Sequence, residues 1–100
     1  MLVVAGTIQL DPTHRPAAEV AFDRMRAATL AEEGCLSYQA YLDRADGGTV
    51  FIFEKWRSQA DLDAHFATPH MAEFGAALAS CGVAGMDVKK YVVSSEGPVP

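Results

Sequence analysis

Four residues in the second half of the chain could carry acid–base chemistry or hold an aromatic compound: Glu54, Trp56, His65 and His70. Glu54 and Trp56 are two positions apart, so they share one face if this segment is a strand. A carboxylate among the apolar residues of such a face either lies at the mouth of a cleft or is paired, because burial of a lone charge is costly. An imidazole at position 65 is a candidate general base or hydrogen-bond donor. This pattern predicts an acid–base site in a cleft between a helix and a sheet.

Each of these residues also has an ordinary structural interpretation. Glu54 can anchor its strand to a backbone amide or a basic residue, and Trp56 can fill the core, as large aromatic residues do in small domains. His65 can be a core histidine bonded to a backbone carbonyl, and His70 can cap the helix that starts after Pro69. The aromatic residues of the predicted strands are core or interface residues in this interpretation: Tyr38, Tyr41, Phe51, Phe53 and Tyr91. Spacing alone leaves both interpretations open.

Several other chemistries lack the residues that they need. His65 and His70 are five positions apart with Pro69 between them, so they do not form the one-face pair of a helical metal site. The sequence has no Cys-x-x-Cys pair and no Gly-x-Ser-x-Gly elbow, and residues 82–85 form a turn rather than a phosphate or dinucleotide loop. We therefore expect no metal and no bound cofactor.

The elements that must position these residues are predicted by the apolar pattern and its glycine and proline breaks. They are strand 2–10, helix 16–33, strands 35–42 and 49–56, a helix after Ser58, a second helix from about residue 70, and strand 86–93. On the three helices the stripes expected to face inward are, in order, Ala17, Val20, Ala21, Met25 and Ala28, then Leu62, His65 and Phe66, then Met71, Phe74 and Leu78.

This βαββααβ order predicts an α+β fold of the ferredoxin-like plait, with four antiparallel strands and helices on one face. The first strand is apolar on both sides, since Leu2, Val4 and Ile8 alternate with Val3 and Ala5. One helix layer covers only one face of a sheet. We therefore expect a homodimer that packs the second face against another copy.

Length and charge limit the class of protein. One hundred residues correspond to one domain, which we place at residues 1–93, followed by a flexible, turn-rich tail at 94–100. The 13 acidic residues exceed the 8 basic ones, giving a net charge of −5, and no basic cluster is present. Nucleic acid and membrane surfaces are therefore not expected partners. With two cysteines and no secretory signal pattern, a cytoplasmic location is expected.

Three segments of the chain together resemble the antibiotic biosynthesis monooxygenase (ABM) domain family. They are residues 33–38 (Glu-Gly-Cys-Leu-Ser-Tyr), residues 53–56 (Phe-Glu-Lys-Trp), and residues 63–74, which contain the run His-Phe-Ala-Thr-Pro-His-Met. The resemblance extends from the first strand to about Val93, and it implies a dimeric α+β barrel made of ferredoxin-like halves. Members that degrade haem have Asn, Trp and His at positions that match Thr7, His65 and the vicinity of Gly75, so the resemblance is to the branch that oxidises quinols and anthrones.

That resemblance implies a monooxygenase that acts on a small aromatic quinol, anthrone or similar phenol with O2 and without a cofactor. His65 is then the base or donor, and Glu54 orients it or a substrate hydroxyl. The expected substrate-binding residues are Tyr38, Trp56, Phe66, His70, Met71 and Phe74. Two other functions stay open: a cofactor-free isomerase of a small carbonyl compound, and a non-enzymatic dimeric module that binds a ligand or is associated with stress.

Overall fold

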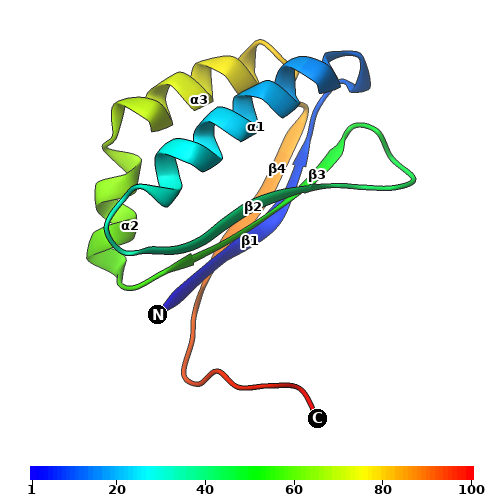
Figure 1. The fold of residues 1–100 in the computed structure, drawn as a ribbon. Helices are drawn as coiled ribbons and strands as arrows, with labels where there is room; N and C mark the ends of the chain where they lie inside the picture. The colour runs from blue at the N-terminus through cyan, green and yellow to red at the C-terminus, as the bar shows by residue number, and fades with distance from the viewer.

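Alternating apolar residues form four strands that pair into one antiparallel sheet in the computed structural model, which describes residues 1–100 (Figure 1). The strands are β1 (Leu2–Gln9), β2 (Cys35–Leu42), β3 (Thr49–Trp56) and β4 (Gly85–Val92). Their order across the sheet is β2-β3-β1-β4, so β1 and β3 are central. Each predicted strand is present, with ends that differ by at most one residue.

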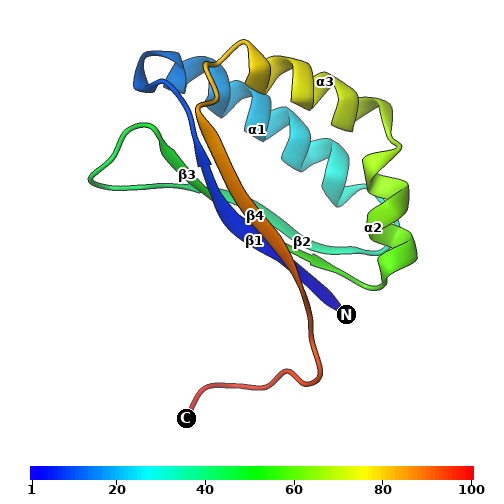
Figure 2. The same ribbon diagram turned by 180° about the vertical axis from the view of Figure 1, so that it is seen from behind.

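The helices all cover the same face of this sheet, as the two opposite views show (Figures 1 and 2). They are the short 3-10 helix η1 (Pro12–His14), α1 (Arg15–Leu30), α2 (Gln59–Phe66) and α3 (Pro69–Ala79). α1 packs beside α3 and over β2, whereas α2 packs against β3. The chain therefore has the predicted α+β plait. None of its helices combines the length and apolar character that a transmembrane span requires.

The buried residues between helices and sheet form two groups. The larger group lies under α1 and α3 and includes Ile8, Phe22, Val50 and Phe74. The smaller group consists of Leu2, Val4, Trp56 and Leu62, and so lies where α2 meets the ends of β1 and β3. The candidate site residues of β3 and α2 lie in or next to this smaller group.

The inward stripe predicted for α1 is only partly correct: Met25 is buried as predicted, but the other buried residues lie about one position further along the chain. The buried residues are Ala18, Phe22, Met25 and Thr29, whereas Val20 is 52% exposed. Alanines on both sides of the helix make its two faces similar in hydropathy, so the large Phe22 ring determines which face packs inward. The helix also ends at Leu30 rather than at residue 33, and the turn that follows places Glu32 beside α2 and α3.

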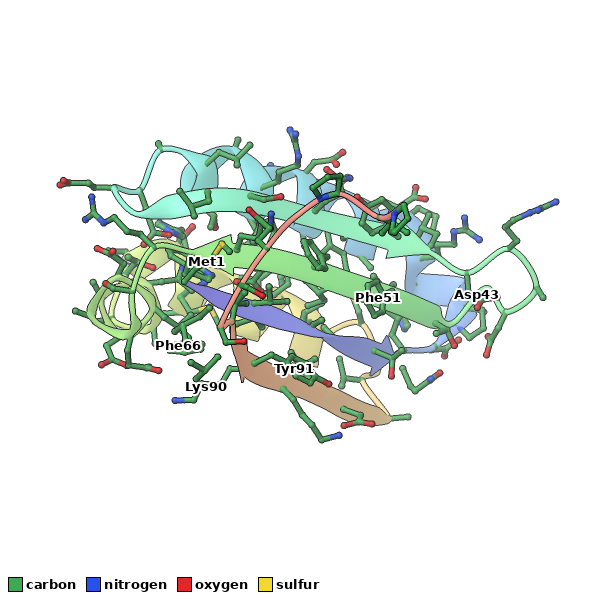
Figure 3. All side chains as sticks on the ribbon, turned by 90° about the horizontal axis from the view of Figure 1, so that it is seen from below. Met1, Asp43, Phe51, Phe66, Lys90 and Tyr91 are labelled. Atoms are coloured by element: carbon green, nitrogen blue, oxygen red, sulfur yellow. The ribbon has the colours of Figure 1, made fainter.

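The second face of the sheet is not covered by helices. Aromatic side chains are exposed there, among them Phe51 and Tyr91, which are labelled in the view from below (Figure 3). Residues 94–100 form no helix or strand, and this segment crosses in front of that face, where Glu96 pairs with Lys55. The homodimer that would cover this face, and the flexibility of the tail, remain predictions.

Candidate functional site

The centre of the site is a buried pair on β3, Glu54 and Trp56. As the strand spacing predicts, both side chains point toward the helices, and both are buried. Trp56 Nε1 donates a hydrogen bond of 2.9 Å to Glu54 Oε1. Loss of water around the carboxyl raises the pKa of Glu54, although the hydrogen bond from Trp56 and the nearby His65 act in the opposite direction. Glu54 is therefore a buried carboxyl with one donor and a weakened tendency to ionise.

His65 lies directly over this pair because α2 begins at a well-defined residue. Ser58 caps the helix by accepting a hydrogen bond from the backbone N–H of Asp61, which sets Leu62 and His65 on the inner side. The His65 side chain is only 2% exposed. Its ring centre is 4.7 Å from that of Trp56, with the planes tilted by 41°.

His70 reaches the same place from α3. The break between the helices is built by Thr68, whose hydroxyl donates to the carbonyl of His65 and accepts from the N–H of Met71. Pro69 occupies the first turn of α3, where its missing N–H has no cost. This sharp turn brings the His70 ring centre to 5.9 Å from that of His65.

Glu32 joins the two imidazoles. Its Oε2 lies 2.6 Å from Nδ1 of His65 and 2.8 Å from Nε2 of His70. An ionised carboxylate only accepts hydrogen bonds, so the geometry corresponds to a proton on each of these nitrogens. The other nitrogen of each ring makes no hydrogen bond within the chain. We call Glu32, His65 and His70 the triad.

Sequence reasoning missed Glu32. The residue lies 33 positions before His65, in the turn after α1, and no periodic pattern connects the two. The only local signal was an acidic residue just before the motif that starts at Glu33. The spacing of His65 and His70 excludes a pair on one helix, but the two rings come from two helices and meet at one carboxylate.

The donor set of the triad, two imidazoles and a carboxylate, is one that zinc or iron accepts in proteins. The three ligand atoms lie within 4.8 Å of one another. In this structure, however, Glu32 Oε2 is in direct hydrogen-bond contact with both rings and takes the central position itself. The arrangement is that of a hydrogen-bonded acid–base cluster, and the expectation of no metal remains a prediction.

The other predicted substrate-binding residues lie at different distances from the triad. Tyr38 is paired with Glu54 across β2 and β3 and is buried, and burial together with this carboxylate raises the pKa of its phenol. Met71 is partly buried, and Phe74 is buried against Phe22 in the larger core. Phe66 was expected on the inner stripe of its helix, but it is 57% exposed (Figure 3).

The structure thus brings Tyr38, Glu54, Trp56, His65 and His70 together. The exposed Phe66 ring also lies beside His65, with ring centres 5.6 Å apart, whereas Phe74 belongs to the larger core. A groove of about 240 Å³ lies between α1 and α3. His70 and Phe74 contribute to it, together with small apolar residues of α1 such as Ala17 and Ala21. Most of the stripe predicted for α1 accordingly lines this groove, although Met25 is also part of the core. The functional roles of all these residues remain predictions.

Comparison with known proteins gives relatives over most of the chain. It is 42% identical over 65 residues to "Putative monooxygenase Rv0793" of Mycobacterium tuberculosis, a match that covers 65% of this chain and 63% of that protein. It is 34% identical over 88 residues to "Probable quinol monooxygenase YgiN" of Escherichia coli, covering 78% of this chain and 85% of that protein. This chain covers only 50% of the length of a third relative, from Synechocystis.

Solved structures share the fold. The structure of Rv0793 superposes with a TM-score of 0.86 at 29% identity, covering 97% of this chain and 98% of that one. A structure from Deinococcus radiodurans gives 0.92 at 23% identity, covering 100% and 99%, and supports the fold alone. The sequence pattern of antibiotic biosynthesis monooxygenases matches residues 1–77. On this match, which includes the triad, Glu54 and Trp56, the chain belongs to the antibiotic biosynthesis monooxygenase family.

Proposed function

We propose that the protein is a cofactor-independent monooxygenase that oxidises a small aromatic quinol, anthrone or similar phenol with O2. The observation that carries this proposal is the buried imidazole of His65, whose Nδ1 is held by Glu32 at 2.6 Å while its Nε2 has no partner within the chain. A carboxylate on one ring nitrogen fixes the tautomer and leaves the other nitrogen as the base. The name of the YgiN relative supports the quinol class.

The chemistry needs such a base because O2 reacts readily only with an electron-rich anion. Ionising a phenol of pKa near 10 at pH 7 costs about 4 kcal/mol, which a positioned base can offset. His65 Nε2 takes the proton, and the substrate anion gives one electron to O2. The two radicals then combine to form a C–O bond, and the resulting peroxide breaks its O–O bond. One oxygen atom stays on the product, and the other leaves as water with the two hydrogens that the substrate loses.

Glu54 and Trp56 would form the back of this site. Their hydrogen bond fixes the indole under the His65 ring, and an apolar wall of this kind keeps water away from the radical pair. Tyr38 beside Glu54 would supply a polar tip for a substrate hydroxyl, and His70 would lie at the groove side. In this proposal Glu32 is a positioning residue, because it acts through His65.

Oxygen uptake tests the proposal. Protein freed of metal by dialysis against a chelator is mixed with menadiol or anthrone, and uptake is compared with the autoxidation blank. We expect uptake above the blank for the native protein and its loss in His65→Ala. The matched control is His14→Ala, since His14 is the third histidine and is exposed far from the triad in the sequence.

Two results would overturn the proposal. One is the absence of uptake with every quinol and anthrone tested from a folded protein. The other is equal uptake by native protein and His65→Ala, which would remove the base role. Conversion of a carbonyl substrate under nitrogen would indicate an isomerase instead.

We further propose that the protein is a homodimer in which a second copy covers the open face of the sheet. The apolar and aromatic residues on that face support this arrangement, since an exposed patch of this kind usually marks an interface.

A further inference from the structure

The triad has the donor types of a metal site, and its ligand atoms come from three separate elements. Nδ1 of His65 belongs to α2, Nε2 of His70 to α3 and Oε2 of Glu32 to the turn after α1, and the three atoms lie within 4.8 Å of one another. Two imidazoles and one carboxylate hold zinc in sites that keep a further position for water. The spacing of the two histidines excludes a pair on one helix, but it does not concern ligands from two helices.

We propose that the triad binds one divalent metal ion of the zinc type and that this ion switches off the base at His65. The metal-free protein is the active form, so the ion acts as an inhibitor and not as a cofactor. Binding of the ion is a property of the protein alone, whereas its effect on activity rests on the proposed oxygenase function.

The triad needs only small movements to accept the ion. Zinc lies about 2.0–2.1 Å from nitrogen and oxygen ligands, which places tetrahedral donors about 3.4 Å apart. Glu32 Oε2 is 2.6 Å and 2.8 Å from the two nitrogens, so it has to withdraw by roughly 0.7 Å from each. The two rings are fixed by their helices and by the hydrogen bonds of Thr68. Glu32 lies in a turn, and its side chain is 14% exposed, so it can move and admit the ion from solvent.

The charge of the triad suits a divalent cation. An ionised Glu32 carries one negative charge, and it pairs only with the two imidazoles and with no lysine or arginine. A divalent ion therefore meets a carboxylate that no fixed cation has neutralised. Cys35 and Glu54 lie nearby, but the Cys35 thiol donates to the carbonyl of Ser37, and Glu54 accepts from Trp56. The ligands are thus the three atoms of the triad, with water in the fourth position.

Metal binding changes which nitrogen of His65 carries the proton. In the metal-free protein Nδ1 holds the proton and donates it to Glu32, and Nε2 has a free lone pair. The ion needs the lone pair of Nδ1, so the Nδ1–H bond breaks and that proton goes to water, while Nε2 takes a proton from water. His70 makes the opposite exchange, losing the proton of Nε2 and gaining one on Nδ1. Both rings stay neutral and no electron moves, since zinc has no redox chemistry. His65 Nε2 is then a donor and cannot accept the proton of a phenol.

The first test is a calorimetric titration of chelator-treated protein with zinc chloride. We expect saturation at one ion per chain. His70→Gln and Glu32→Gln each remove one ligand and should weaken binding by about tenfold or more. The matched controls are His14→Gln, which changes an exposed histidine outside the triad, and Cys35→Ser, which removes the nearby thiol. Both controls should bind zinc as tightly as the native protein. The proposal is overturned if zinc does not saturate one site per chain, or if folded His70→Gln and Glu32→Gln bind it as tightly as native protein.

NMR of protein with 15N-labelled histidine identifies the nitrogen that the ion binds. We expect zinc to move the His65 proton from Nδ1 to Nε2, with the same dependence on zinc concentration as the calorimetric signal. A proton that stays on Nδ1 in the zinc-loaded protein would mean that the ion binds elsewhere or through Nε2, and it would overturn the proposal.

Oxygen uptake tests the inhibitory effect separately from the site. With a quinol or anthrone that the metal-free protein oxidises, one equivalent of zinc should abolish the uptake above a blank that contains zinc, and a chelator should restore it. Unchanged uptake at full zinc loading would overturn the inhibitory role. If the metal-free protein oxidises none of these compounds, the proposed oxygenase function fails, whereas the titration and the NMR spectra still decide whether the triad binds the ion.

Discussion

Glu54 Oε1 accepts a hydrogen bond of 2.9 Å from the indole Nε1 of Trp56, two residues further along the same strand. Neighbours two apart on a strand share a face but are about 7 Å apart along it, so this contact needs both side chains to lean together. It is the only hydrogen bond of the buried Glu54 carboxyl. Because of it, Trp56 is at once a core residue and the partner of a candidate catalytic residue.

Trp56→Phe should destabilise the protein, because the ring remains but the donor to Glu54 is lost. A buried acceptor left without its partner costs about 1–3 kcal/mol, to which a smaller packing loss is added. We expect a decrease of that size in the free energy of unfolding, measured in urea at pH 7. In the Glu54→Leu background the same change should cost clearly less, since no orphaned carboxyl remains. Equal costs in both backgrounds would show that the hydrogen bond contributes little.

Glu54→Gln should change how stability depends on pH. Burial raises the pKa of Glu54 above its value in the unfolded chain, so the folded state holds this proton more tightly. Between the unfolded and the raised folded pKa, the folded state binds more protons, and the contribution of Glu54 to stability falls as pH increases. Glutamine keeps an oxygen for Trp56 Nε1 and removes the titration.

The measurement is urea unfolding of native protein and Glu54→Gln from about pH 4 to pH 8. We expect the variant to gain stability relative to the native protein as pH increases through this window, with the difference levelling off once Glu54 is ionised. A difference that is constant with pH would mean that the carboxyl ionises in the folded state as easily as in the unfolded chain, and a difference that grows as pH decreases would mean that it ionises more easily there.

Much of this arrangement follows from sequence periodicity. A strand repeats every two residues, so Glu54 and Trp56 had to share the face that carries Val50 and Ile52, and the structure confirms this. Ser58 as the first residue before α2 was predictable from the capping preference of serine. The strand order and the helix layer follow from the same elements.

What could not be predicted depends on turns and on ambiguous faces. Glu32 lies in a turn 33 residues before His65 in the sequence, and packing between these two distant segments sets the direction of the turn. No local pattern therefore identifies Glu32. Phe66 was assigned to the inner face because it follows His65, but a helix of eight residues has room for only two buried positions against β3, Leu62 and His65. In α1, several alanines make two faces of the helix equally plausible as the buried face, and only the packing of Phe22 decides between them.

Thr29→Val should stabilise the protein. Thr29 is completely buried at the end of α1, and its hydroxyl has no hydrogen-bond partner. Valine has nearly the same shape and a similar helix propensity, and it removes the cost of an unsatisfied polar atom. We expect an increase of about 1 kcal/mol in the free energy of unfolding. Thr29→Ser keeps the hydroxyl, loses a methyl group and should be less stable than the native protein. A Thr29→Val protein less stable than native would show that the hydroxyl has a partner.

Phe51→Glu should break the proposed homodimer. Phe51 lies on the open face of the sheet, on the central strand β3 and near Tyr91 in the view of Figure 3, so a carboxylate there would be buried without a partner when two sheets pack together. Light scattering at micromolar concentration should give the native protein twice the chain mass of 10.7 kDa and the variant a single chain mass. Val20→Glu is the control and should remain dimeric, because Val20 is also apolar and exposed but lies on the helix layer. A native protein of single chain mass would remove the dimer. Loss of the dimer in Val20→Glu but not in Phe51→Glu would instead place the interface on the helices.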